Sequence, residues 1–169
     1  ATNVYLRYRT HSQRVVEQLP VSATRLRALN SGSVMEGAKE QAVGLAIKLE
    51  GAKGEEIITP LLADAQKRGA RVYAHGEHRV VLFSPRLTRS VNPEMLAVRL
   101  AKDVEKVLAE HNQKTKGKVN FGIGAARGEM ISEMKNGEFS FTATTSFIPV
   151  AKRLASASEQ QTLISHELY

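Results

Sequence analysis

The apolar residues of this chain fall into short runs, most of them with the composition of β-strands. Residues 42–49 (AVGLAIKL) are almost continuously apolar, which predicts a buried strand. Residues 71–74 and 79–83 are rich in strand-forming side chains and flank the polar sequence His75-Gly76-Glu77-His78, an order that predicts a compact hairpin. Further runs with strand character lie at residues 119–124, 129–133, 138–144 and 162–165.

Helix signals appear in three segments between these runs. A helix is predicted over about 59–68, because Thr59 can cap it and Pro60 suits its first position. Residues 92–111 begin with the same kind of pair, Asn-Pro, and carry one apolar stripe at helical spacing. A last helix is predicted over about 146–156.

The predicted order of elements is β-α-β-β-α-β-β-β-α-β. Hairpins and helices in this order predict an α+β fold, in which an antiparallel-rich sheet is flanked by helices. The N-terminal part of the chain differs, because it is basic and contains only short helical pieces at about 10–18 and 21–30. We interpret residues 1–32 as a basic helical lead-in and residues 33–169 as the folded domain.

Composition narrows the chemistry that the chain can perform. Its 169 residues are enough for one domain with a hydrophobic core. The absence of cysteine excludes disulfides, thiolate catalysis and metal sites with cysteine ligands. A net charge of +7 permits an acidic partner, a nucleic acid or an anionic membrane surface without establishing one.

Aspartate is scarce in this sequence. Of 17 acidic residues only two are aspartate, Asp64 and Asp103, and both lie in predicted helices. Metal-dependent phosphoryl chemistry usually needs carboxylates at strand ends or tight turns, where they can face a magnesium ion. The sequence offers no aspartate at such a place.

Two local motifs invite a functional interpretation. The glycines of FGIGAARG (residues 121–128) lack the following helix that a dinucleotide-binding loop requires, so we interpret them as strand and turn residues. His75, Glu77 and His78 have the side chains of a metal site. Neighbouring residues of a strand point to opposite faces, which lets only His75 and Glu77 share one, so a polar hairpin tip is the preferred interpretation.

From about residue 33 onward, the order of elements and several strings resemble the catalytic domain of class III adenylyl and guanylyl cyclases. The strings that carry the resemblance are VMEG before AVGLAIKLEG, LLADAQKRGARVYAHGEHRVVLF, VNFGIGAARGEMI and SFIPVAKRLASASEQQTLISHELY. They correspond to the first core strand, the helix with its Gly-turn hairpin, the glycine-containing strand, and the last helix and strand of that family. The resemblance implies a ferredoxin-like or cyclase-like fold over roughly 130 residues.

At the metal-binding positions of this family the sequence departs from the pattern. The first metal aspartate corresponds to Lys48, and the second, in the Gly-Asp turn, corresponds to Glu77. A lysine ammonium repels magnesium, at a cost of several kcal/mol when the two charges are about 4 Å apart. If Lys48 occupies the lost metal position, we expect its ammonium to lie close to Glu77 and to form an ion pair with it. The alternative is an exposed charge that merely ends the strand.

The positions that contact nucleotide in this family are also changed. The lysine that recognises the base corresponds to Tyr73, and its partner aspartate corresponds to Ser146. The asparagine that positions the ribose becomes Pro149, whereas the transition-state arginine is retained as Arg153. The resemblance therefore implies a vestigial ligand-binding cleft at Lys48, Tyr73, Glu77, Ser146 and Arg153, with no catalytic residue, no metal and no cofactor.

These departures predict a degenerate, catalytically inactive domain that is not an enzyme and that acts in signalling as a regulatory or protein-interaction module. Because members of the family pair, we expect a homodimer or a different protein partner, with contacts at the final helix and around Gly124–Gly128. The alternative is a sensor that binds a nucleotide or another phosphate ligand without metal. The sequence does not favour nucleic-acid binding. We expect a cytoplasmic domain, which the lead-in could hold near a membrane as part of a larger parent protein.

Overall fold

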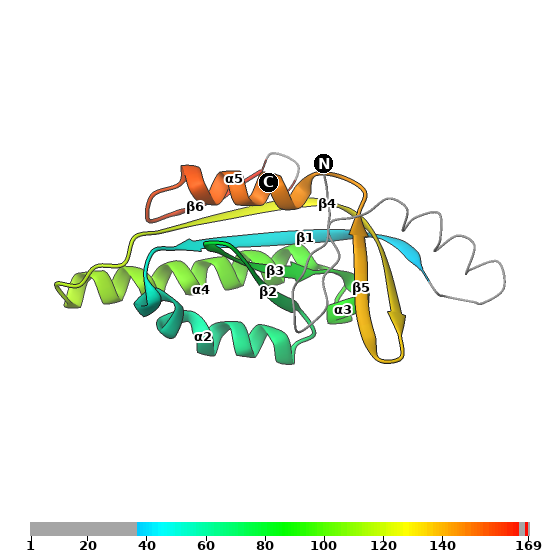
Figure 1. Ribbon diagram of the computed structural model, residues 1–169, viewed down its shortest axis with the longest axis horizontal. Coiled ribbons are helices and arrows are strands. Elements are labelled where there is room, and N and C mark those ends of the chain that lie inside the picture. Colours follow the sequence, from blue (N-terminus) through cyan, green and yellow to red (C-terminus); the bar gives the residue numbers. More distant parts are fainter. Residues whose placement is uncertain (1–36, 166–167, 169) are drawn as a thin grey trace.

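A sheet of six strands forms the centre of the structure (Figure 1). The computed structural model describes residues 37–165 and residue 168. The strands run in the order β2-β3-β1-β4-β5, and β6 pairs with β4 in parallel, whereas every other pairing is antiparallel. Their bounds are β1 (Ala38–Leu49), β2 (Arg71–His75), β3 (His78–Phe83), β4 (Phe121–Lys135), β5 (Glu138–Ala143) and β6 (Thr162–Ile164).

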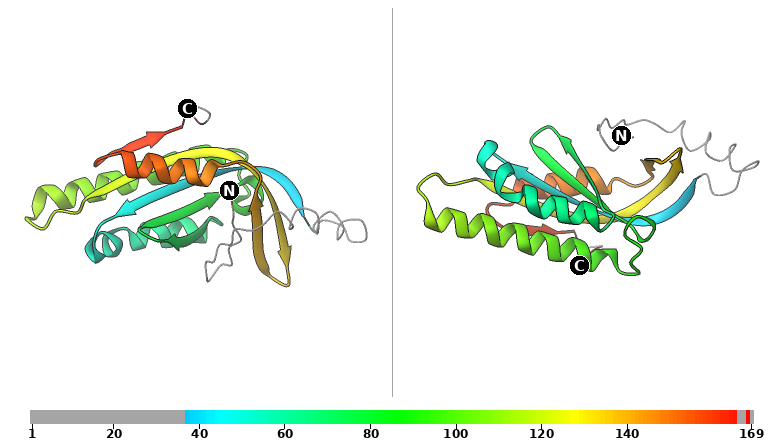
Figure 2. Two further views of the ribbon diagram at one scale, coloured as in Figure 1. Left: turned by 45° about the horizontal axis from the view of Figure 1, so that its top comes forward. Right: turned by 90° about the horizontal axis from the view of Figure 1, so that it is seen from below.

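Helices cover both faces of this sheet. In Figure 1, α2 (Ala52–Lys67) and α4 (Pro93–Lys114) lie below the sheet and α5 (Phe147–Ala157) lies above it. Figure 2 shows α2 and α4 side by side when the molecule is seen from below. The short helix α3 (Pro85–Thr88) follows β3. This architecture confirms the predicted α+β fold with an antiparallel-rich sheet and flanking helices.

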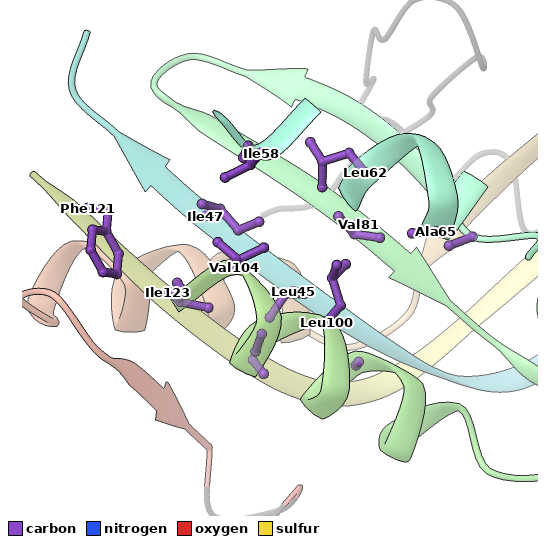
Figure 3. Close-up of a cluster of buried hydrophobic side chains, with 14 of the residues drawn as sticks. Leu45, Ile47, Ile58, Leu62, Ala65, Val81, Leu100, Val104, Phe121 and Ile123 are labelled. Carbon is purple, nitrogen blue, oxygen red and sulfur yellow. The ribbon is translucent and has the colours of Figure 1, made fainter. Parts of the chain in front are cut away.

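The alternation of side chains along β1 divides the core into two layers. Leu45 and Ile47 point toward α2 and α4, where they pack with side chains such as Ile58 and Val104 (Figure 3). Ala46 belongs to the second layer, beneath α5. The apolar run of residues 42–49 is therefore a strand buried on both faces, as predicted.

Glycines of β4 allow α5 to lie directly on the sheet. A Cβ atom at Gly124 would collide with the backbone carbonyl of Ala151, and one at Gly128 would collide with Thr145 and Phe147. These two glycines are covered by α5 and its N-terminal loop, whereas Arg127 between them is exposed, so partner contacts around Gly124–Gly128 stay a prediction. FGIGAARG is part of a strand that has been adapted to helix packing.

Two predicted element boundaries are wrong. Helix α2 begins at Ala52 and not near Thr59, and Pro60 lies inside it. The earlier start brings Ile58 into the core, and this burial outweighs the preference of proline for a helix start. The runs 119–124 and 129–133 are not separate strands, because the intervening residues continue to pair with β1 throughout.

The predicted lead-in, residues 1–32 with its helical pieces, lies outside the described residues. Within the described part of the chain, no helix combines the length and the apolar character needed to cross a membrane.

Candidate anion-binding site

Lys48 lies near the end of β1 and belongs to the face of the sheet that α5 covers. The residues two and six positions before it on the same strand, Ala46 and Ala42, are buried in the layer beneath α5. Lys48 itself is partly exposed, because the sheet ends there. Its direct partner on β3 is His78.

The β2–β3 hairpin brings two histidines together on this face. His75 and His78 are paired across a turn made only of Gly76 and Glu77, and cross-strand partners point to the same side of a sheet. The sequence interpretation, in which His75 shares a face with Glu77, is therefore wrong. The turn removes Glu77 from the strand alternation on which that interpretation rested.

Helix α5 completes the group. Lys152 contacts Nδ1 of His75, and Oγ of Ser156 lies 3.4 Å from Nε2 of His78. Because a lysine ammonium can only donate, Nδ1 of His75 accepts this hydrogen bond. We call Lys48, His75, His78 and Lys152 the basic cluster.

Both histidines of the basic cluster have a lowered pKa. Burial, followed by the charges of Lys152 and Lys48, lowers the pKa of His78 to about 4. The pKa of His75 is lowered by burial and then by Lys152. The positive charge of the basic cluster is thus carried by its two lysines, whose combined field resists a further proton and attracts an anion.

The sequence-predicted pair of Lys48 and Glu77 does not form. No ion pair joins the two residues, although both are described. Glu77 is exposed in the hairpin turn, where its backbone carbonyl accepts a hydrogen bond from the amide of Leu49 at 3.3 Å. Lys48 instead faces His78, one position further along the hairpin.

The other predicted site residues are not part of the basic cluster. Tyr73 is buried beneath α5, and its ring centroid lies 6.5 Å from that of Phe141, so it belongs to the core. Ser146 is exposed at the N-cap of α5 without a side-chain capping bond. Arg153 is exposed and, at 100° per residue, lies opposite the buried face of α5.

The residues at this site do not fit the metal ions that the resemblance implies for cyclases. Among residues 37–165 and 168, no three His, Cys, Asp or Glu side chains are placed to hold a metal ion together. Lys48 supplies an ammonium where a carboxylate would be needed, and His78 lies beside it. The chemistry of the donor set suits an anion.

Comparisons with known proteins give matches only at the level of structure. No protein-family model and no curated protein matches the sequence. The adenylyl cyclase CyaB from P. aeruginosa aligns at 17% identity and a TM-score of 0.53, over 79% of this chain and 81% of that chain. The guanylate cyclase domain of RhGC from Catenaria anguillulae in complex with GTP aligns at 13% and 0.55, over 78% and 82%.

A third solved structure extends the comparison to a dimer. It is the non-canonical dimeric guanylyl cyclase domain of the RhoGC fusion protein from the aquatic fungus Blastocladiella emersonii, at 12% identity and a TM-score of 0.57, over 78% of this chain and 83% of that chain. The chain has the fold of a class III cyclase domain. Sequence identities this low establish only the fold of this cyclase-like domain.

The expectation that this cyclase-like domain is not an enzyme is corrected by the comparisons. The solved structures that share its fold carry the names of adenylyl and guanylyl cyclases, which are enzymes. The absence of the metal-binding aspartates is therefore not sufficient to conclude that the chain is not an enzyme.

Proposed function

We propose that this cyclase-like domain is a regulatory module that binds the phosphate groups of a nucleotide at the basic cluster, without a metal ion. The observation that carries the proposal is the convergence of Lys48 and Lys152, from β1 and α5, on the histidine pair of the β2–β3 hairpin. The three elements are far apart in sequence and meet only in the fold.

The electrostatics of the basic cluster suit a phosphate group. Lysine binds phosphate as a point charge, and each ammonium carries several hydrogen-bond donors. A bound anion also favours the protonated form of a neighbouring imidazole, so it raises a histidine pKa that the lysines hold down. A phosphate group at this place can accept hydrogen bonds from both lysines and balance their charges.

The comparisons favour a nucleotide as the source of the phosphate. Two of the solved structures with this fold are complexes with a nucleotide, GTP in one and ATPalphaS in the other. In this chain, Lys48 supplies one of the positive charges that metal ions would supply in a metal-dependent site.

Calorimetry in the presence of EDTA tests the proposal. Inorganic pyrophosphate and ADP should bind the wild-type protein, and Lys48→Gln or Lys152→Gln should each weaken binding about tenfold, as expected for the loss of a charge-assisted hydrogen bond. Lys102→Gln is the matched control, because Lys102 is exposed on α4, across the sheet. Absence of binding, or an equal loss in the control, would contradict the proposal.

The regulatory role that we propose includes pairing, either with a second copy or with a different subunit. Its support is the RhoGC structure, which is that of a dimeric guanylyl cyclase domain. The exposed face of α5 remains available for such a contact, since Arg153 lies there in the open.

A further inference from the structure

A pocket of about 310 Å³ adjoins the basic cluster where β1 ends and β4 begins. Lys48 and Ser156 line it, and the same Ser156 reaches His78 of the basic cluster. Its volume is near the lower end of the range for ligand pockets, about 300–1,000 Å³, so it suits one ring of a ligand and not a whole nucleotide.

One wall of the pocket is formed by Gly122 of β4 and by the segment that follows α5. The two are closely packed, because a Cβ atom at Gly122 would collide with the carbonyl oxygen of Ala155 and with Ser158. The amide of Gln160 donates to the carbonyl of Phe121 at 2.8 Å, and the amide of Ile123 donates to Oγ of Ser158 at 3.0 Å. The pocket therefore has a wall held by hydrogen bonds that are independent of any ligand.

The rim of the pocket carries negatively charged hydrogen-bond acceptors. Glu50 and Glu159 both line it, and the carboxylate of Glu50 is oriented by a hydrogen bond from Nδ2 of Asn120 at 3.2 Å. Two carboxylates repel a phosphate group, so the phosphates cannot occupy this rim. Carboxylates do accept hydrogen bonds from the hydroxyls of a ribose, as in dinucleotide-binding folds.

We infer that this pocket binds the sugar of the nucleotide whose phosphates bind the basic cluster. The inference rests on the proposed function and adds an orientation to it, in which Lys48 lies between the two ends of the ligand. Glu50 and Glu159 accept hydrogen bonds from the sugar hydroxyls, and the hydroxyl of Ser156 lies on the boundary.

Three ligands separate the sugar from the phosphates. Pyrophosphate carries no sugar, whereas ADP and 2′,3′-dideoxyadenosine diphosphate differ only in the sugar hydroxyls. In calorimetry with EDTA, ADP should bind the wild-type protein about tenfold more tightly than the dideoxy compound, as hydrogen bonds to charged groups predict. Glu50→Gln and Glu159→Gln should each reduce this difference and leave pyrophosphate binding undiminished.

The outcomes distinguish this inference from the proposed function. Both glutamates are exposed, so their replacement should not disturb folding, and Glu110→Gln on α4 is the matched control. Equal binding of ADP and the dideoxy compound, alongside binding of pyrophosphate, would overturn the sugar site and leave the phosphate site standing. A preference for ADP that survives in both variants would also overturn it. Absence of binding by both pyrophosphate and ADP would overturn both proposals.

Discussion

At the scale of single residues, His78 couples the basic cluster to pH. Its pKa in the folded protein is about 4, against an ordinary value of 6.5, because of burial and the lysine charges. The unfolded chain therefore takes up a proton at a higher pH than the folded protein does. Stability that is present above pH 6.5 is lost as the pH falls from about 6.5 to about 4.

Replacing His78 with glutamine should remove this contribution. We expect the melting temperature of His78→Gln to fall less than that of the wild type between pH 6.5 and 4.5, with a difference of about 2 to 4 °C, equivalent to about 1 kcal/mol. This magnitude is discounted because the imidazole is only partly buried. Melting curves measured by circular dichroism at several pH values provide the test, and parallel acid sensitivity of the two proteins would contradict it.

The residues of the site were only partly accessible from the sequence. The apolar run of residues 42–49 predicts that Lys48 lies near the end of a buried strand. Which residue lies beside Lys48 depends on the length of the turn between β2 and β3. A two-residue turn pairs His75 with His78, and counting the turn residues would have shown this. Lys152 was missed in favour of Arg153, and a shift of one residue rotates a helical side chain by 100°. The spacing of the small residues Ala151 and Ala155, which are both buried, marks the face of α5 that packs on the sheet and could have indicated this orientation.

At the scale of elements, the contact between α5 and β4 depends on glycine. Gly124→Ala would place a Cβ atom against the backbone of α5, where neither side can yield cheaply. We expect a loss of about 1–3 kcal/mol of unfolding free energy, as for other overpacked sites. Gly117→Ala is the control, because nothing lies within 4 Å of a Cβ atom there. Denaturant titration measures both, and an unchanged Gly124→Ala variant would refute this description of the interface.

Most elements could be predicted because their signals are local. The hairpin of β2 and β3 and the capped helix α4 each carry their own pattern of apolar and capping residues. The start of α2 and the continuity of β4 could not be predicted, since they depend on Ile58 in the core and on pairing with β1. Tertiary contacts outweighed local preference at both places.

At the scale of the whole molecule, the proposed regulatory role predicts that the domain pairs with a second copy of itself or with a different subunit. Light scattering at increasing protein concentration should show the mass of a dimer, or a pull-down should recover a different subunit. The measurement should be made with and without pyrophosphate, because ligand binding at the basic cluster can influence contacts on the exposed face of α5. A strict monomer at high concentration, with no partner recovered, would contradict the pairing that we propose.

The most direct test of the central claim is calorimetric titration of the metal-free protein with inorganic pyrophosphate in EDTA. The basic cluster predicts binding in the micromolar to millimolar range, weakened about tenfold by Lys48→Gln and by Lys152→Gln and unchanged by Lys102→Gln. Absence of heat from millimolar pyrophosphate, in protein shown to be folded by circular dichroism, would contradict the account.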